Sequence, residues 1–222
     1  MKNSNLISLE IIDTIRQIDL KSSVLYLHSF HTAALVLDLA TNLGLLTTEK
    51  NKQFWYLAAL LHDIGKLDIP SHILLKPGKL TASEMVVMQQ HSTFSFERLL
   101  AIEPFVKFAR AAYEHHEKND GSGYPQKLRG HEMCVEARLL SLADRFEACT
   151  SSGREYRPAA LPLAQVFHML SPDIRAFFPG KYGIIVNTML DYHREHRIHA
   201  DAWGEDRVAL DLYTSLPRVV NS

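Results

Sequence analysis

The sequence predicts an all-α protein whose helices form a bundle around a metal site. Apolar residues recur at helical spacing through most of the 222 residues. No convincing run of alternating polar and apolar residues, the pattern typical of a half-buried strand, interrupts them. Histidines and carboxylates recur in the middle of the chain, and helical bundles build metal sites from such side chains on facing helices.

The first three helices follow from apolar spacing and from residues that end or cap helices. Apolar positions over 9–18 and 24–43 predict two helices, and Gly44 ends the second. Thr47 and Thr48 are candidate caps of a third helix, whose apolar run over 54–61 leads directly to a His-Asp pair. Gly65 and Pro70 then break this helix, and we expect Gly65 to supply the backbone freedom that lets the pair converge on one ion.

The middle of the chain predicts three more helices. The segment 81–84, Thr-Ala-Ser-Glu, resembles a capping box and opens a helix that carries His91. A helix over 105–117 follows, then a glycine-rich loop. Helical periodicity resumes over 135–150, with Asp144 near the middle of that helix.

The C-terminal third carries a weaker signal. Segments 163–170 and 184–196 read as helices, and we expect Pro172, Pro179 and Gly180 to separate them. A further short helix is expected in the tail that begins at Asp201.

We expect one domain over 1–222, since no repeat, low-complexity tract or Gly/Ser linker divides the chain. Residues 1–25 would form an N-terminal helix, 26–158 a core with the motifs, and 159–222 the C-terminal helices.

Composition excludes several classes of function. Lys and Arg total 24 against 25 Asp and Glu, so no basic field favours a DNA or RNA polymer or an anionic membrane. Cys134 and Cys149 form no CxxC pair, which suits a reducing cytoplasm. The longest apolar run, 54–61, is far short of the roughly 20 residues of a membrane span, and the N-terminus lacks a signal-peptide pattern. A cytoplasmic protein without membrane insertion is expected.

Seven side chains are candidate metal ligands. A buried His beside an Asp is more often a hydrogen-bonded core pair than a metal site, so the His62-Asp63 dipeptide alone is weak evidence. Five imidazoles and two carboxylates on predicted helices, however, would be costly to bury without a shared cation. The candidates are His28, His62, Asp63, His91, His115, His116 and Asp144.

The glycine-rich loop after His116 is the second unusual feature. Gly121 and Gly123 permit backbone conformations closed to other residues, and Pro125 stiffens the exit. The loop can therefore hold Tyr124 in a fixed place, although a purely structural loop is the competing interpretation.

The ordered motifs resemble the HD superfamily of metal-dependent phosphohydrolases, specifically its HD-GYP branch of cyclic-di-GMP phosphodiesterases. The resemblance runs from about His28 to Pro158. An HD dipeptide alone is common by chance, but the whole series is specific. The motifs are His28-Ser29, Leu61-His62-Asp63-Ile64-Gly65-Lys66, Ile73-Leu74-Leu75-Lys76-Pro77-Gly78-Lys79-Leu80, His91, His115-His116-Glu117, Asp120-Gly121-Ser122-Gly123-Tyr124-Pro125 and Ala143-Asp144.

The resemblance implies a dinuclear centre bridged by Asp63. One metal would be held by His28, His62, Asp63 and Asp144, and the second by His91, His115 and His116. The family favours iron or manganese, whereas ligand type alone leaves zinc and nickel open. Two ions about 3.5–4 Å apart can share a hydroxide that attacks a phosphodiester.

The resemblance also implies substrate contacts. Lys66 would be the cation on the scissile phosphate, and Arg154 or Arg157 would hold the second phosphate. The loop carrying Tyr124 is associated in the family with cyclic-di-GMP activity and with diguanylate cyclase contacts. Each cation also has an ordinary interpretation as a solvated surface charge.

Three positions depart from the family pattern. Val24 stands where a subset of the family has a Glu that helps to hold a third metal, so we expect two metals. His31 replaces a frequent Arg and Ser95 a Gly, and both changes should affect packing more than ligation.

The resulting prediction is a phosphodiesterase that hydrolyses cyclic-di-GMP to pGpG, with onward hydrolysis to GMP left open. Two alternatives remain. The first alternative is a hydrolase of another cyclic dinucleotide or of a nucleotide phosphate. The second is a noncatalytic adaptor. An adaptor would bind cyclic-di-GMP or a diguanylate cyclase through the Gly123-Tyr124-Pro125 loop.

Overall fold

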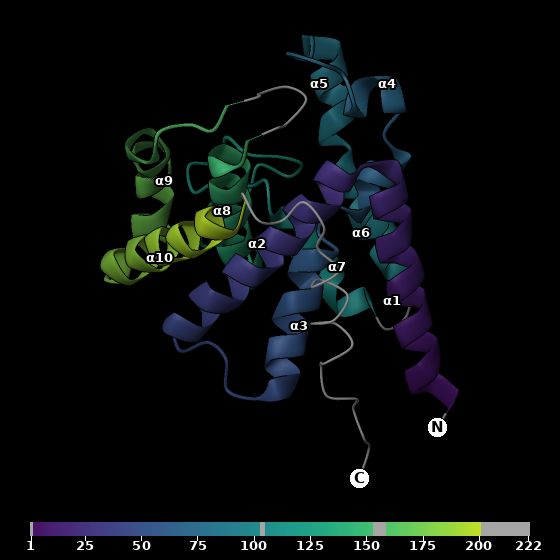
Figure 1. The fold of residues 1–222 in the computed structure, drawn as a ribbon, viewed down its shortest axis with the longest axis horizontal. Coiled ribbons are helices and arrows are strands. Elements are labelled where there is room, and N and C mark those ends of the chain that lie inside the picture. The colour runs from purple at the N-terminus through teal and green to yellow at the C-terminus, as the bar shows by residue number, and fades with distance from the viewer. Residues whose placement is uncertain (1, 103–104, 153–158, 201–222) are drawn as a thin grey trace.

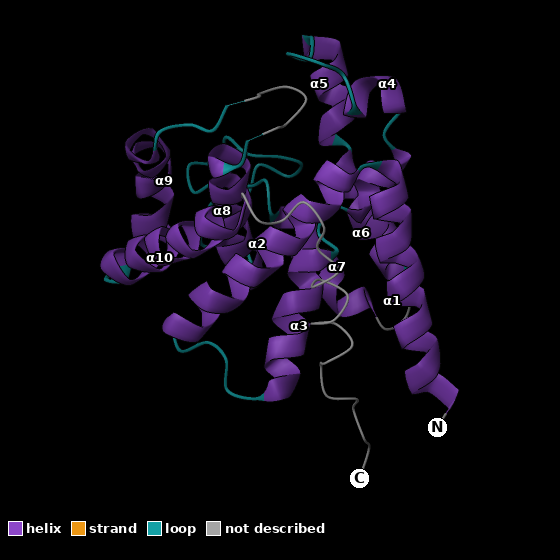
Figure 2. Cartoon of the chain, viewed as in Figure 1, coloured by secondary structure: helices purple, strands orange, loops and turns teal. Residues whose placement is uncertain are grey.

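The structure is a computed structural model that describes residues 2–102, 105–152 and 159–200. Within these ranges it is helical, and the only pairing of strand type is an isolated bridge between Asp120 and Arg129 (Figures 1 and 2). The all-α prediction is confirmed. The elements are α1 (Lys2–Lys21), α2 (Ser23–Asn42), α3 (Glu49–Leu60), a 3-10 helix η1 (Ile64–Asp68), α4 (Ser71–Leu74), α5 (Ala82–Gln89), α6 (His91–Leu100), α7 (Val106–Glu114), α8 (Val135–Thr150), α9 (Leu163–Phe177) and α10 (Tyr182–Ala200).

Hydroxyl side chains cap three of these helices. Ser22 accepts a 3.2 Å hydrogen bond from a backbone N–H in the first turn of α2, and Thr48 does the same for α3 at 3.2 Å. Thr81 and Glu84 form the reciprocal capping box of α5. Each cap satisfies an N–H that has no partner within its helix, and a cap is typically worth about 1 kcal/mol.

The larger core cluster surrounds α2, which crosses the middle of the molecule and packs against α3, α8 and α10 (Figure 1). Leu35 and Leu39 of α2 and Leu139 of α8 are fully buried, and Phe146 is 1% exposed. Burying one such side chain contributes about 1.5–3 kcal/mol, so this cluster fixes α2 against α8.

Helix α2 is also long and apolar enough to cross a membrane, a property that the longest uninterrupted apolar run did not indicate. Of its most apolar window, 56% is buried inside the protein. Its apolar character is therefore accounted for by the core.

A second core cluster joins the end of α3 to η1, α6 and α7. Leu61, Ile64 and Leu99 are buried there against Phe105 and Phe108. This cluster supports the turn that contains the His62-Asp63 dipeptide. The candidate ligands thus lie on elements drawn from both clusters.

Several predicted boundaries were wrong. Helix α7 ends at Glu114, so the predicted helix 105–117 is too long. Pro172 lies inside α9 rather than ending it, because α9 buries Leu170 and Ile174 on either side of the proline. The expected N-terminal helix over 1–25 is divided at Ser22. The helix expected after Asp201 lies outside the described residues.

Candidate metal centre

Seven side chains from several separate parts of the chain meet at one point. His28 comes from α2, the His62-Asp63 dipeptide follows α3, and His91 begins α6. His115 and His116 follow α7, and Asp144 lies on α8. All are buried except His116, which is partly exposed. The structure therefore brings together all seven candidates from the sequence.

Asp63 lies between two groups of histidines. Its Oδ2 is 3.6 Å from Nε2 of His28 and 3.2 Å from Nε2 of His62. Its Oδ1 is 3.3 Å from Nε2 of His91 and 3.8 Å from Nε2 of His115. A carboxylate in this position can offer one oxygen to each of two cations. The bridging role that the resemblance implies is compatible with this position and stays a prediction.

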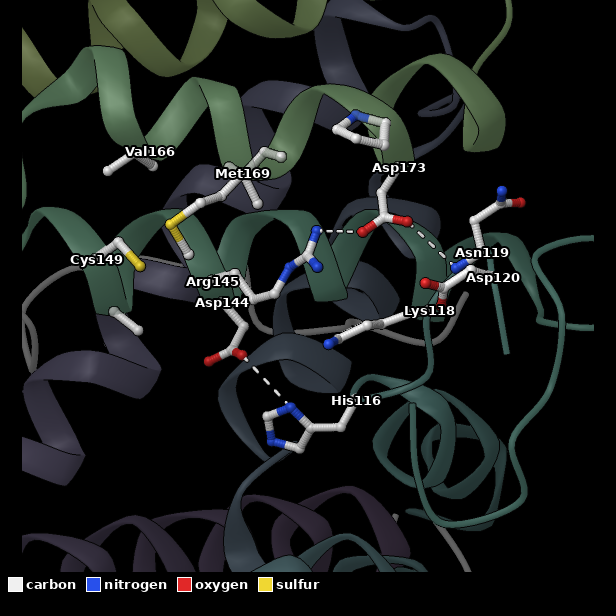
Figure 3. Close-up of a pocket in the computed structure, with 13 residues that line it drawn as sticks. His116, Lys118, Asn119, Asp120, Asp144, Arg145, Cys149, Val166, Met169 and Asp173 are labelled. Atoms are coloured by element: carbon white, nitrogen blue, oxygen red, sulfur yellow. Dashed lines mark hydrogen bonds and ion pairs between the residues drawn. The ribbon is translucent and has the colours of Figure 1, made fainter. Parts of the chain in front are cut away.

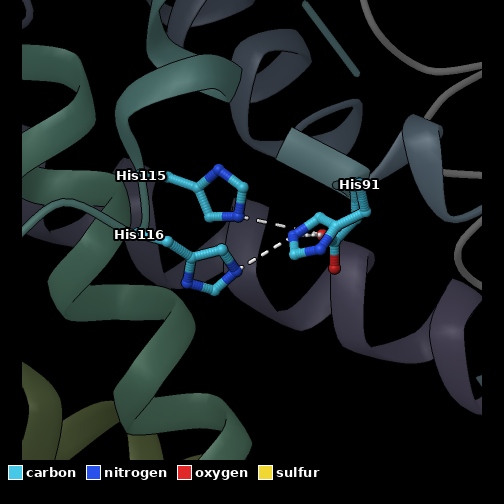
Figure 4. Close-up of side chains that lie close together, drawn as sticks. His91, His115 and His116 are labelled. Atoms are coloured by element: carbon cyan, nitrogen blue, oxygen red, sulfur yellow. Dashed lines mark hydrogen bonds and ion pairs between the residues drawn. The ribbon is translucent and has the colours of Figure 1, made fainter. Parts of the chain in front are cut away.

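Asp144 and His116 complete the two groups. Asp144 Oδ1 is 2.9 Å from Nε2 of His28 and 3.8 Å from Nε2 of His62, while its Oδ2 is 4.0 Å from Nδ1 of His116. On the other side, Nε2 of His116 is 3.0 Å from Nε2 of His91 (Figure 4). Figure 4 shows the rings of His91, His115 and His116 facing one another.

The histidines are oriented through their Nδ1 atoms. In His62, His91 and His115, Nδ1 lies 2.5–2.7 Å from the backbone carbonyl oxygen three residues earlier. An Nδ1–H that donates to such a carbonyl leaves Nε2 with a lone pair aimed into the centre. In His28 the same role falls to Glu147, whose Oε2 contacts Nδ1.

Three atoms of the centre have no hydrogen-bond partner among the described residues, although they are buried. They are Nε2 of His62, Nε2 of His115 and Oδ1 of Asp63. Leaving one polar group buried and unpaired costs about 1–3 kcal/mol. Divalent cations would satisfy all three atoms. The donors form two groups, the ligand atoms within each group lie within 4.8 Å of one another, and Asp63 belongs to both groups. The residues therefore fit divalent metal ions.

Charge states in the metal-free centre suit a cation at two of the histidines, whereas His62 would have to release a proton to bind one. Burial lowers the pKa of His91 to about 4 and that of His115 to about 3, so both rings are neutral near pH 7. Burial acts in the same direction on His62, but Asp63 and Asp144 outweigh it and raise the pKa to about 10. Burial would raise the pKa values of both carboxyl groups, yet the neighbouring histidines hold them well below the usual range.

The turn after the dipeptide corrects one expectation. The chain loosens into η1 as predicted, but Gly65 does not have a positive φ. Glycine is required because α6 approaches closely: a Cβ on Gly65 would lie 2.2 Å from the carbonyl oxygen of His91. Lys66, which follows, lies with its Nζ 2.5 Å from Asp63 Oδ2. Its side chain is 17% exposed, so it can reach a ligand beside the centre.

The glycine-rich loop is wrapped around Glu117. That carboxylate accepts hydrogen bonds of 2.6 and 3.0 Å from two backbone N–H groups of the loop. Gly121 has φ +78°, and a Cβ on Gly123 would lie 2.4 Å from the Cα of Glu117. Tyr124 stacks on His116, with ring centroids 4.7 Å apart. The loop thus holds Tyr124 at the edge of the centre, and its role toward a substrate stays a prediction.

Sequence reasoning missed two buried carboxylates near the candidate ligands, and one of the two, Glu147, contacts one of those ligands. Glu147 lies three residues after Asp144 on α8, and that spacing on one helix face was a signal for it. Glu114, buried at the end of α7, accepts a 2.7 Å hydrogen bond from the backbone N–H of Cys134. Arg154 and Arg157, the predicted phosphate ligands, lie outside the described residues.

A cavity of about 490 Å³ adjoins the centre (Figure 3). His116 and Asp144 line it together with the loop after His116 and with parts of α8 and α9. The cavity thus gives a ligand of nucleotide size access to the two residues that it shares with the centre.

Comparison with known proteins gives the same picture. The HD domain family matches residues 14–172. The chain is 40% identical over 157 residues to the 3'3'-cGAMP-specific phosphodiesterase 1 of Vibrio cholerae, covering 71% of this chain and 36% of that protein. It is 41% identical over 151 residues to the cyclic di-GMP phosphodiesterase response regulator RpfG of Xanthomonas campestris pv. campestris, covering 67% and 38%. The chain thus spans little more than a third of these relatives.

Two solved structures share the fold. The HDG"Y"P protein Bd1817 of Bdellovibrio bacteriovorus superposes with a TM-score of 0.57 at 22% identity, over 74% of this chain and 50% of that one. The HD domain of the phosphodiesterase PgpH of L. monocytogenes, solved with cyclic-di-AMP, has a TM-score of 0.57 at 18% identity, over 81% and 94%. At these identities the likeness concerns the fold.

Proposed function

The chain belongs to the HD domain family, and from this premise we propose that it is a metal-dependent phosphodiesterase that hydrolyses cyclic-di-GMP to the linear dinucleotide pGpG. The observation that carries the proposal is the position of Asp63, whose two carboxylate oxygens face two separate groups of histidines. The names of the relatives support a cyclic dinucleotide as the substrate.

When bound, two divalent ions would supply an activated water and neutralise charge on the phosphodiester. The residues of the chain have distinct roles around that chemistry. His28, His62 and Asp144 would hold one ion, His91, His115 and His116 the other, and Asp63 both. We propose iron or manganese, which suit mixed imidazole and carboxylate donors.

Lys66 is the proposed cation on the scissile phosphate. Its Nζ already lies 2.5 Å from the carboxylate that both ions would share, so a phosphate held there comes within hydrogen-bond reach. Neutralising the developing charge on the phosphate oxygens is the contribution expected of such a group. Tyr124, stacked on His116, would bound the substrate on the opposite side. Arg154 and Arg157 remain proposed ligands of the second phosphate.

A second candidate substrate is 3'3'-cGAMP. The observation that favours it is the specificity in the name of the Vibrio cholerae relative, which is as similar to this chain as the cyclic di-GMP relative is. Comparing kcat/KM for the two cyclic dinucleotides decides between them.

A noncatalytic adaptor is disfavoured by the complete set of donors and by the unpaired atoms among them. Contact with a diguanylate cyclase through the Gly123-Tyr124-Pro125 loop is proposed only as an additional partnership. It would use the exposed Ser122, since Tyr124 faces the centre. A cytoplasmic location is part of the proposal and accords with two free cysteines, Cys134 and Cys149.

The test is anaerobic turnover of cyclic-di-GMP by protein reconstituted separately with iron, manganese and zinc, with bound metal counted and pGpG and GMP quantified. Turnover at about two metals per chain supports the proposal. The His62→Ala/Asp63→Ala protein is the inactive control. Full activity in that control, or tight binding without product under every condition, contradicts the proposal.

A further inference from the structure

We propose that Lys118 binds the phosphate of a cyclic dinucleotide that is not being hydrolysed, and that the adjoining cavity holds the nucleoside next to that phosphate. The inference rests on the proposed function, since it concerns the same substrate. It assigns a cation from the described part of the chain to a task that sequence reasoning gave to Arg154 or Arg157.

The cavity has two chemically different walls. Val166, Met169 and Leu170 of α9 form an apolar wall, whereas the loop after His116 brings Lys118 and Asn119 to the other side. A phosphate alone would need no apolar wall and would occupy little of about 490 Å³. A nucleoside phosphate uses both walls, because its base and sugar bury apolar surface and its phosphate requires a cation.

Lys118 is the cation in this cavity that is free to bind an anion. Its side chain is exposed and makes no hydrogen bond or ion pair with any residue that the structure describes. Figure 3 shows its Nζ directed into the space bounded by His116, Asp144 and Arg145. The neighbouring Asp120 carboxylate is occupied within the loop, where it accepts a 2.9 Å hydrogen bond from the backbone N–H of Ser122.

Arg145 forms an ion pair that positions the loop, although its buried Nε has no hydrogen-bond partner among the described residues. Its Nη2 is 2.7 Å from Oδ2 of Asp173 on α9. The other oxygen of Asp173 accepts a 3.2 Å hydrogen bond from the backbone N–H of Asn119, the residue after Lys118. One carboxylate thus ties α8, α9 and the loop together (Figure 3). The backbone that carries Lys118 is therefore fixed beside the centre.

Lys66 and Lys118 lie near different members of the centre. Lys66 lies at Asp63, and Lys118 follows His116 by two positions. A cyclic dinucleotide carries two phosphodiesters on one ring, so one phosphate at the metal ions and Lys66 leaves the other for a second cation. Lys118 has the charge, the exposure and the direction for that second contact.

The test compares Lys118→Met with wild type on two substrates: cyclic-di-GMP, with two phosphates, and bis(p-nitrophenyl) phosphate, with one. Losing a charge-assisted contact should raise KM for the cyclic dinucleotide about tenfold to a hundredfold. Turnover of bis(p-nitrophenyl) phosphate should stay within about twofold, since the metal ligands are untouched. Lys118→Arg should retain binding. Lys127→Met, in the same loop but outside the cavity, should behave as wild type.

Calorimetric binding of pGpG to the metal-loaded proteins separates this inference from the proposed function. If wild type hydrolyses no cyclic dinucleotide, the proposed function fails, and weaker pGpG binding by Lys118→Met than by Lys127→Met still supports the subsite. An equal loss of activity on both substrates would mean that Lys118 stabilises the centre and does not bind the second phosphate, which would overturn the inference. Unchanged KM and unchanged pGpG affinity in Lys118→Met would overturn it too.

Discussion

The Ser95 hydroxyl on α6 accepts a 2.9 Å hydrogen bond from the backbone N–H of Gly65, and this contact fastens the turn after the His62-Asp63 dipeptide to the next helix. Both residues are buried. The contact explains how a serine is accommodated where the family often has glycine. The hydroxyl lies at the closest approach of the two segments and satisfies an N–H there.

Gly65→Ala should unfold the protein at a lower temperature. The new Cβ would lie 2.2 Å from a backbone oxygen of His91 and 2.3 Å from the backbone nitrogen of Ser95, atoms that cannot move independently of α6. Overpacking of this kind costs about 1–3 kcal/mol or more. A scanning calorimeter should record a Tm several degrees below wild type, at about 2–4 °C per kcal/mol.

Gly183→Ala is the matched control for that substitution. A Cβ at Gly183, which is in the first turn of α10, would have no neighbouring atom within 4 Å. The Tm of this variant should stay at or slightly above that of wild type, because alanine favours helix. A Gly65→Ala protein as stable as Gly183→Ala would contradict the close approach of α6.

Glu147→Gln should weaken metal binding without abolishing the fold. The carboxylate contacts Nδ1 of His28 and so fixes which ring nitrogen faces the centre. Losing such a partner of a metal-binding histidine typically costs tenfold to a hundredfold in metal affinity. Competition with a chelator of known affinity measures the change. Glu97→Gln, an exposed change on α6, should match wild type, and equal affinity in both variants would exclude a role for Glu147.

Removing metal should lower the stability of the native protein. One ion at a hundred times its Kd contributes about 2.7 kcal/mol, so chelation should shift Tm by roughly 5–10 °C. The physical reason is the return of three buried polar atoms to an unpaired state. Thermal scans with a chelator and with added manganese measure the shift. The His62→Ala/Asp63→Ala protein should show almost none, and a full shift there would place the metal elsewhere.

The metal-free protein should lose stability as pH falls from about 6.5 to about 4.5. Burial lowers the pKa of His91 to about 4 and of His115 to about 3 from an ordinary 6.5, so in this window the unfolded chain binds more protons. His62 acts in another window, because its raised pKa of about 10 confers stability that is complete below 6.5 and lost toward pH 10. The lowered pKa values of Asp63 and Asp144 matter only below about their ordinary 3.8.

Urea unfolding of the chelated protein at half-unit pH steps measures how the free energy of unfolding changes with pH. This change should approach about 1.4 kcal/mol per pH unit for each histidine that stays neutral in the folded protein. His115→Asn, which removes one such group, should have a flatter profile than wild type over the same range. An unchanged stability between pH 6.5 and 4.5 in the wild type would mean that His91 and His115 titrate normally.

Local features of the fold were predictable because their causes are local. Helix α8 runs from Val135 to Thr150, as its periodicity predicts, and Thr81 forms the expected capping box. The prediction that Pro172 ends a helix was wrong because the proline signal is local. The helix α9 continues through it, since apolar side chains on both sides of the proline are buried. The requirement for glycine at position 65 could not be predicted from local sequence either, since it arises from contact with α6, which begins at His91.

The candidate site was likewise predictable only in part. Motif order identified the seven side chains that meet, but not the Glu147 carboxylate that contacts His28. Glu147 was within reach through its spacing from Asp144. The tie between Asp173, Arg145 and the loop depends on how α9 packs, and a sequence pattern does not encode that packing.

The contact between His28 and Glu147 also has a consequence for synthesis of the protein. The two residues are 119 positions apart in the chain. A ribosome that adds about 5–20 residues per second therefore needs several seconds or more after His28 before the last supporting carboxylate exists. During that interval the early histidines are available to any transition metal without the site that would select among them. We therefore expect correct metal loading only after α8 is complete.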